Sequence, residues 1–219
     1  ILFGGPGADG KVQARVPVAT TSGGGIVYFR PVLCFAPPFS SQAPAASGTL
    51  TCSPSTQLTE ANLGVSPNGT GFTANNVEKP DTALEGAPST SPSAHHASST
   101  VLLPGLSSNG GTRYLLGPAQ MTGTSIISAA ARRDQTTGKW TGRWVVDYTT
   151  NRRGVAILDK VAEQNFHQLL AVELDGVVYS TPLIQPTQVS FTTFDGRGEI
   201  GGSLTKADAI KLAHAINQY

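Results

Sequence analysis

The segment 169–184, which reads LLAVELDGVVYSTPLI, decides the fold of this chain. Two apolar runs stand on either side of Asp175 and Gly176. An Asp-Gly pair between such runs favours a type I′ turn, because that turn needs positive φ at both central residues. The segment therefore predicts a β-hairpin with Asp175 and Gly176 in its turn.

Helical patterns precede and follow this hairpin. Asn151 can cap the first helix, because its side chain can accept hydrogen bonds from amides of the first turn. Thr205 can cap the second, with Asp208 three residues later as a weaker capping-box partner. Apolar residues at helical spacing predict one buried stripe on each helix: Val155, Leu158, Val161 and Ala162 on the first, and Ala209, Leu212, Ala213 and Ile216 on the second.

Strand patterns fill the rest of the C-terminal half. They predict strands over residues 114–116, 140–148 and 188–194, and a glycine-rich edge or bulged strand over residues 198–202. With the hairpin and the helices, this order indicates an α+β fold, in which two helices pack on one face of an antiparallel sheet.

Two further strands are predicted near the N-terminus. Residues 11–18 alternate apolar and polar side chains, and residues 26–33 are rich in β-branched and aromatic types. Pro31 lies near the end of the second strand and cannot donate a ladder hydrogen bond. We therefore expect that end of the strand at a sheet edge or a bulge.

Residues 36–111 have a different composition, dominated by Ser, Thr, Pro, Ala, Gly and Asn. Such a segment has few large apolar groups to offset its ordering entropy. We expect this irregular segment to pack either on its own lobe or on a partner. The preferred interpretation is a partner, which it would contact through Phe39, Leu63, Phe72 and Leu84. The chain then has three parts: N-terminal strands that join the sheet (1–35), the low-complexity segment (36–111), and an α+β lobe (112–219).

The two cysteines, Cys34 and Cys52, lie 18 positions apart. In an oxidising compartment we expect them to form a disulfide, which would stabilise the fold by roughly 3 kcal/mol in the chain-entropy model. The alternative is a pair of buried thiols that behave as small hydrophobic groups.

Three motifs occur in a recognisable order: GPAQMTG at 117–123, VELDGVVYSTP at 172–182 and GEIGGSLTKADAIKLA at 198–213. This order resembles the head part of the large extracytoplasmic domain of SecD, a subunit of the bacterial protein-export machinery. VYFRPVL at 27–33 resembles the strand that enters the same domain in actinobacterial SecD proteins. The resemblance covers about half the chain. It implies the same α+β fold, a location outside the cytoplasm and a protein-binding role.

Composition and motifs argue against several functions. Charged residues make up 13% of the chain and the net charge is +1, which does not indicate nucleic-acid binding. The G-x-G-x-x-G at 196–201 does not indicate dinucleotide binding, because the chain ends 18 residues later, before the acidic ribose ligand expected about 20 residues on. The tandem pair His95–His96 is interpreted as incidental rather than as a metal site. No catalytic, cofactor-binding or metal-binding residue and no small-molecule substrate is predicted.

Two functions remain open from the sequence. The leading hypothesis is a non-enzymatic accessory subunit, an actinobacterial stand-alone relative of SecD in the cell envelope that docks on a larger membrane complex. Because the first residues, ILFGGPG, resemble the end of an apolar segment, an N-terminal membrane helix before them is part of this hypothesis. The alternative is the head domain of a SecD-type subunit that captures unfolded, translocating polypeptide. Asn68 begins a glycosylation sequon, whose use the sequence leaves open.

Overall fold

The computed structural model describes residues 25–44, 49–59, 63, 79–136 and 138–218. The expected strand over 11–18, Phe72 and Asn68 lie outside the described residues. The strands are β1 (Val27–Ala36), β2 (Val101–Pro104), β3 (Arg113–Leu116), β4 (Met121–Thr122), β5 (Ile126–Thr136), β6 (Lys139–Thr150), β7 (Leu170–Leu174), β8 (Val177–Ser180) and β9 (Arg197–Leu204). The α-helices are α1 (Arg152–Gln164) and α2 (Lys206–Ile216), and short 3-10 turns occur at Thr82–Leu84, Pro92–Ala94, Ser107–Asn109 and Gly123–Ser125.

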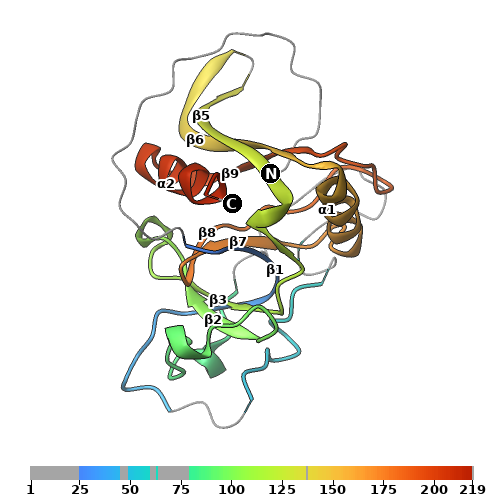
Figure 1. Ribbon diagram of the computed structural model, residues 1–219. Coiled ribbons are helices and arrows are strands. Elements are labelled where there is room, and N and C mark those ends of the chain that lie inside the picture. The colour runs from blue at the N-terminus through green and yellow to red at the C-terminus, as the bar shows by residue number, and fades with distance from the viewer. Residues whose placement is uncertain (1–24, 45–48, 60–62, 64–78, 137, 219) are drawn as a thin grey trace.

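The strands form two antiparallel sheets (Figure 1). The larger has the order β2-β3-β1-β7-β8, with β4 paired to the first part of β1. It curls until its ends meet, because Gly105 after β2 bridges to Val178 of β8 and the Leu106 amide donates to the Val178 carbonyl at 3.1 Å. We call this nearly closed sheet the barrel. Its interior is one apolar cluster with members from all five strands, including Val32, Val101, Leu116, Ala171 and Val178.

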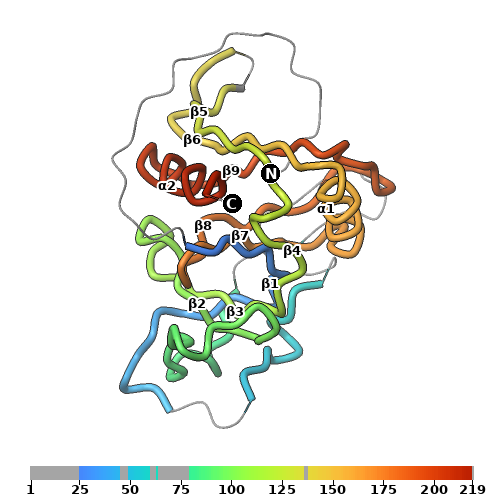
Figure 2. Tube along the Cα trace, viewed as in Figure 1, coloured from blue at the N-terminus to red at the C-terminus, as the bar shows by residue number. Residues whose placement is uncertain are grey.

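The smaller sheet has the order β5-β6-β9. The α+β class expected from the sequence is confirmed, but the expectation of one sheet is wrong, because β5, β6 and β9 pair among themselves within the described part of the chain. Helix α2 contacts all three of these strands, and α1 contacts β4 and β6. Both helices lie between the two sheets (Figures 1 and 2). One core therefore joins the outer face of β1 and β7 to both helices and the smaller sheet.

The local signals for the helices are confirmed. The Asn151 side chain accepts a hydrogen bond from the Gly154 amide at 2.7 Å. Thr205 and Asp208 form a complete capping box. Of the eight residues expected in the helix stripes, Val155 is only partly buried. The other seven are buried: Leu158, Val161, Ala162, Ala209, Leu212, Ala213 and Ile216.

The hairpin turn has positive φ at both Asp175 (54°) and Gly176 (76°), as a type I′ turn requires. Of the two positions expected for the strand end at Pro31, the sheet edge is wrong, because β1 lies at the centre of the larger sheet. The Pro31 carbonyl accepts from the Gly117 amide at 3.0 Å, beside the connection between β3 and β4. The missing N–H of Pro31 thus falls at a gap between two partner strands, one residue before a register shift that begins at Val32.

Residues 188–194 form a loop, so the strand predicted there is wrong. The Gln185 side chain accepts from the Thr192 amide at 3.0 Å and donates to the Thr192 carbonyl at 2.5 Å, while Asp159 accepts from the Phe194 amide at 2.8 Å. Side chains therefore occupy backbone groups that a neighbouring strand would otherwise use. The glycine-rich strand β9 forms an edge of its sheet with a shifted register, as expected.

The segment 36–111 is not irregular throughout, because it contains β2, a strand of the barrel. Leu63 and Leu84 from other described parts of it pack against the barrel strands, which corrects the expectation of a partner-ordered arm. Leu63 and Leu84 are buried in the protein's own clusters, at 0% and 3% exposure. They are therefore unavailable as partner contacts. Phe39 is 51% exposed, and its ring lies beside the Arg113 guanidinium.

Polar contacts also hold this segment. Asp81 is buried and accepts hydrogen bonds from the Ser53 amide and hydroxyl, the Thr56 hydroxyl and the Ala83 amide. The Cys34–Cys52 disulfide, which the sequence predicted, attaches residues near the start of the segment to β1. The composition of the segment is low in apolar residues, but its backbone is held by buried polar groups of the fold.

Candidate functional site

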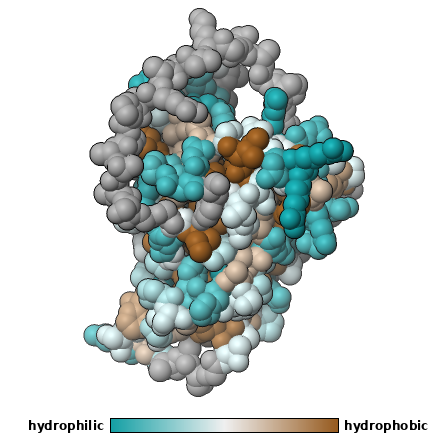
Figure 3. Space-filling view, in the orientation of Figure 1, coloured by the Kyte–Doolittle hydropathy of each residue, from teal (hydrophilic) through white to brown (hydrophobic). Residues whose placement is uncertain are grey.

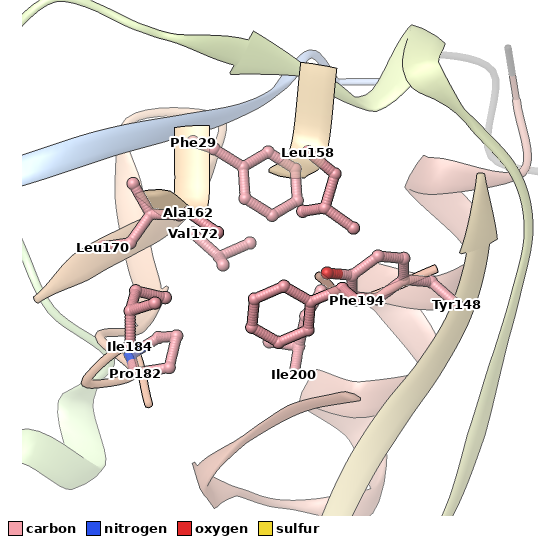
Figure 4. A pocket seen from close by; sticks show the side chains of 10 residues that line it. All are labelled: Phe29, Tyr148, Leu158, Ala162, Leu170, Val172, Pro182, Ile184, Phe194 and Ile200. Carbon is pink, nitrogen blue, oxygen red and sulfur yellow. The ribbon is translucent and has the colours of Figure 1, made fainter. Parts of the chain in front are cut away.

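A small enclosed void lies in the core shared by the two sheets and the helices. It measures about 10 Å³, which is about one water-sized sphere. Figure 4 shows its apolar lining, which comes from both sheets and α1: Phe29, Tyr148, Leu158, Ala162, Leu170, Val172, Pro182, Ile184, Phe194 and Ile200. Burial, with a smaller effect of the Asp159 charge, raises the pKa of the Tyr148 hydroxyl well above its usual value. This void belongs to the core and is too small for a ligand.

An open cleft of about 430 Å³ lies between β4, the start of α1 and the segment around Ala97. Its volume is within the range of ligand-binding sites. The described residues that line it are Ala97, Ala119, Gln120, Met121, Thr122, Thr124, Ser125, Asn151, Arg153 and Ile157. Four of these, residues 119–122, belong to the GPAQMTG motif, so the motif forms part of the cleft lining. Figure 2 shows β4 between β1 and α1.

The cleft lining mixes polar side chains with apolar ones and carries one positive charge. Of the described lining residues, Arg153 is the one charged side chain. The Thr122 and Thr124 hydroxyls lie 2.6 Å apart at the surface, and Gln120 Oε1 accepts from Asn165 Nδ2 at 2.6 Å. Hydroxyls and amides can exchange hydrogen bonds with a peptide backbone, whereas a lining without a paired acid and base is poorly suited to proton transfer.

A buried charge cluster lies beside this cleft. It consists of Arg30 on β1, Glu173 on β7 and His95 on the segment that precedes β2. Glu173 Oε2 lies 2.6 Å from His95 Nε2 and 3.4 Å from Arg30 Nε, and the Arg30 and Glu173 side chains are fully buried. The Tyr28 ring lies 4.9 Å from the guanidinium carbon of Arg30 and contacts the His95 ring edge-on. Burial raises the pKa of Glu173, against the opposing effects of His95 and Arg30.

Arg30 connects the cluster to the cleft through four backbone carbonyls. Its Nη2 donates to His96 at 2.8 Å, and its Nη1 donates to Ala97, Ser99 and Gly117 at 3.3, 3.0 and 3.1 Å. Burial lowers the pKa of Arg30, although the Glu173 charge opposes this effect. The Ala97 carbonyl also accepts from the Ala119 amide at 2.7 Å. Two lining residues of the cleft, Ala97 and Ala119, are therefore held together beside Arg30.

Sequence reasoning missed this cluster. It treated His95 as incidental and assigned no role to Glu173. The usable signal was a charged residue between apolar neighbours on a predicted strand, as in YFRPV for Arg30 and AVELD for Glu173. Such a charge is either exposed or paired when buried, and the sequence does not decide between these outcomes.

A second charged group lies on the exposed face of the smaller sheet. Arg132 donates to Asp147 at 2.5 Å and also contacts Glu199. Because Arg132 and Asp147 are more than 40% exposed, solvent screens their attraction. On the face shown in Figure 3, hydrophobic residues form small separate patches among hydrophilic ones.

Two further observations concern the described residues as a group. Their His, Cys, Asp and Glu side chains form no set of three that could hold a metal ion. Their helices include none with the length and hydrophobicity needed to cross a membrane.

The structure is an antiparallel α+β domain with an open cleft whose one charged lining residue is Arg153. The family described as SecDF, P1 head subdomain, matches residues 100–218, more than half of the chain. The chain therefore belongs to the SecDF P1 head subdomain family. Glu173 and most of the cleft lie inside the matched part, whereas Arg30 and His95 lie before it.

Two curated relatives are both called "Protein translocase subunit SecD". The protein from Endomicrobium trichonymphae is 34% identical over 106 residues, which cover 47% of this chain and 20% of the relative. The protein from Syntrophobacter fumaroxidans is 41% identical over 61 residues, which cover 28% of this chain and 10% of the relative. The chain thus spans a fifth or less of the length of these relatives.

Two solved structures are also similar. One, described as "Structure and function of a membrane component SecDF that enhances protein export", is 22% identical, with a TM-score of 0.43, 88% of this chain covered and 62% of the other. The second, "Crystal structure of SecDF in Super-membrane-facing form", is 20% identical, with a TM-score of 0.44, 89% of this chain covered and 19% of the other.

Proposed function

We propose that this domain binds an extended polypeptide segment in the cleft, as a non-enzymatic part of a protein-export machinery. The observation that carries the proposal is the position of the GPAQMTG motif, which lies in the family-matched region and forms part of the cleft lining. An extended chain offers unpaired amides and carbonyls, which the hydroxyls and amides of the lining can satisfy. The names of the curated relatives, which are protein translocase subunits, support a polypeptide as the ligand.

The same proposal places the domain outside the cytoplasm. The support is the Cys34–Cys52 disulfide, because such bonds persist in oxidising compartments and are rare in reducing ones. Attachment to a membrane through a helix before residue 1 is part of the proposal and can be tested by fractionating cells that produce the natural protein.

A second candidate function is docking on a larger membrane complex as an accessory subunit. The observation that favours it is the exposed end of the β5–β6 hairpin, where residues 139–143 are all exposed. Trp140 at this end is 54% exposed, and the Arg133 guanidinium lies over its ring. Ile127 on β5 is 62% exposed. Exposed Trp and Arg side chains are frequent anchors in protein interfaces.

The cleft proposal is tested by fluorescence anisotropy with a labelled, permanently unfolded polypeptide. Thr124→Trp places a large side chain in the cleft, and Thr193→Trp places the same side chain on an exposed loop as a matched control. We expect the first change to weaken binding by about tenfold or more, equivalent to one lost anchor contact, and the second to leave it unchanged. Equal affinity of the wild-type protein and Thr124→Trp would exclude the cleft as the binding site.

The docking candidate has its own test. Purification of the natural protein from membranes, followed by identification of co-purifying subunits, is repeated with Trp140→Ala. Loss of the co-purifying subunits in this variant, with polypeptide binding in the anisotropy assay retained, would favour docking through the hairpin.

A further inference from the structure

Ala97 lines one side of the cleft, and we call the segment around it, residues 95–99, the cleft wall. The side chains of residues 96–98 are exposed, so apolar burial contributes little to holding this segment. Most of its described long-range contacts are polar: three of its carbonyls accept from Arg30, one of these also accepts from the Ala119 amide, and the His95 ring contacts Glu173. The His95 ring also meets the Tyr28 ring edge-on. Charge-assisted hydrogen bonds of this kind are stronger than neutral ones.

The groups that hold the wall belong to two adjacent strands of the barrel. Arg30 and Glu173 project from β1 and β7, which are paired along five residues. The positions of both side chains are therefore set by the sheet rather than by the wall. Glu173 orients both partners at once, because the same oxygen, Oε2, faces His95 and Arg30.

Hydrogen bonds satisfy the buried charged groups of this cluster only in part. Within the described residues, Glu173 Oε1 and Arg30 Nε are buried without a hydrogen-bond partner, even though Arg30 Nε lies close to Glu173. A buried charge pair with unsatisfied atoms contributes less to stability than its proximity suggests. Stabilisation of the fold alone therefore does not explain this arrangement well. Its contacts with residues 95–99 do fix the position of the wall.

We propose that Arg30, Glu173 and His95 form a latch that holds the cleft wall closed against the barrel, and that removing the Glu173 charge releases the wall. Glu173 is then a positioning residue for the cleft. This inference rests on the proposed function only for the statement that the cleft binds polypeptide. Of the three latch residues, Glu173 lies inside the family-matched residues, and Arg30 and His95 lie before them.

Hydrogen exchange measured by NMR tests the latch at two adjacent amides. The Ala119 amide donates to the Ala97 carbonyl of the wall, whereas the Gln120 amide donates to the Phe29 carbonyl of β1. Opening of the wall exposes the first amide and leaves the second in place. The pair therefore separates release of the wall from a general loss of stability, which would affect both amides.

The variants are Glu173→Gln and His95→Gln, with His96→Gln as the control. His96 contributes its backbone carbonyl to Arg30, and this carbonyl is kept in the control. In the first two variants we expect exchange at Ala119 to rise by about tenfold, the effect of one lost charge-assisted hydrogen bond. Exchange at Gln120, and both amides in the control, should change by less than about twofold, as expected for a surface change.

Parallel rises at Ala119 and Gln120, or no rise at Ala119, would overturn the latch. A selective rise at Ala119, together with a changed affinity for the unfolded polypeptide in Glu173→Gln, supports both the latch and the cleft. A selective rise at Ala119 with unchanged affinity supports the latch and overturns the cleft as the polypeptide site. The two proposals can therefore fail separately.

Discussion

Arg113 Nη2 donates a hydrogen bond of 2.7 Å to the carbonyl of Leu84, which lies 29 positions earlier in the chain. The same guanidinium donates to the carbonyls of Pro37, Glu85 and Ala87. One buried side chain on β3 thus holds two stretches of a segment whose composition suggested an unattached arm. This relationship changes what mutations in and around the segment should do.

Arg113→Met should destabilise the protein strongly. The change keeps most of the apolar stem but removes the Arg113 donor from four carbonyls, of which Leu84 and Glu85 keep a bond from the Ala87 and Ser40 amides. An unsatisfied buried acceptor costs about 1–3 kcal/mol. We expect a loss of roughly 3 kcal/mol or more in the free energy of unfolding, measured by urea denaturation. Arg197→Met, at an exposed position, is the control and should change stability by less than about 0.5 kcal/mol.

Deletion of residues 53–99 should destabilise the fold rather than leave the C-terminal lobe intact. It removes Asp81, Leu84 and the carbonyls that Arg30 and Arg113 bind, so two buried guanidinium groups lose most of their acceptors. Thermal melting followed by circular dichroism checks this. A deleted protein that melts at the wild-type temperature would show that the packing of this segment contributes nothing to the fold.

The disulfide should contribute measurably to stability. Cys34 is fully buried on β1, and its bond to Cys52 closes an 18-residue separation. We expect the Cys34→Ser/Cys52→Ser variant to lose roughly 3 kcal/mol in the free energy of unfolding, as for a loop of this size. Mass spectrometry without reductant should find the two cysteine peptides linked, and labelling of both thiols in the native protein would contradict the bond.

Asp81 should make part of the stability depend on acid pH. Burial opposes its ionisation, but hydrogen bonds from Ser53, Thr56 and Ala83 outweigh burial and lower the pKa of Asp81. A lowered folded-state pKa means that the contribution is present above the unfolded value of about 3.9 and is lost as the pH falls through the folded-state pKa.

The difference in unfolding free energy between the wild-type protein and Asp81→Asn should therefore shrink as the pH is lowered from 6 to below about 3.9. Urea titrations at a series of pH values measure this difference. Asp195→Asn, at an exposed aspartate, should show little difference at any pH. A constant difference for Asp81→Asn would mean that its ionisation contributes nothing.

Leu212→Ala should create a cavity in the core shared by α2 and both sheets. Leu212 is fully buried there, so the expected cost is about 2–5 kcal/mol in the free energy of unfolding. Lys211→Ala, at the exposed neighbouring position, keeps the helix and leaves the core untouched. Similar small effects of both changes would place the buried face of α2 elsewhere.

The local elements follow from short stretches of the sequence. The Asp175–Gly176 turn, the caps at Asn151 and Thr205 and the helix stripes each depend on a few neighbouring residues. The structure contains these features, with Val155 of the first stripe only partly buried. The disulfide could also be predicted from the sequence, because the chain has only two cysteines. These features are local or leave few alternatives, so residue type and spacing are sufficient to predict them.

Tertiary structure alone decided how the polar groups are used. Arg30 meets the Ser99 carbonyl across 69 positions, and His95 meets Glu173 across 78. No local pattern records such pairings, and a charged residue on a strand is compatible with exposure or with paired burial. The division into two sheets, the packing of residues 79–99 and the loop over 188–194 have the same origin. Each depends on which distant group satisfies a buried backbone amide or carbonyl, and that is settled only when the chain is folded.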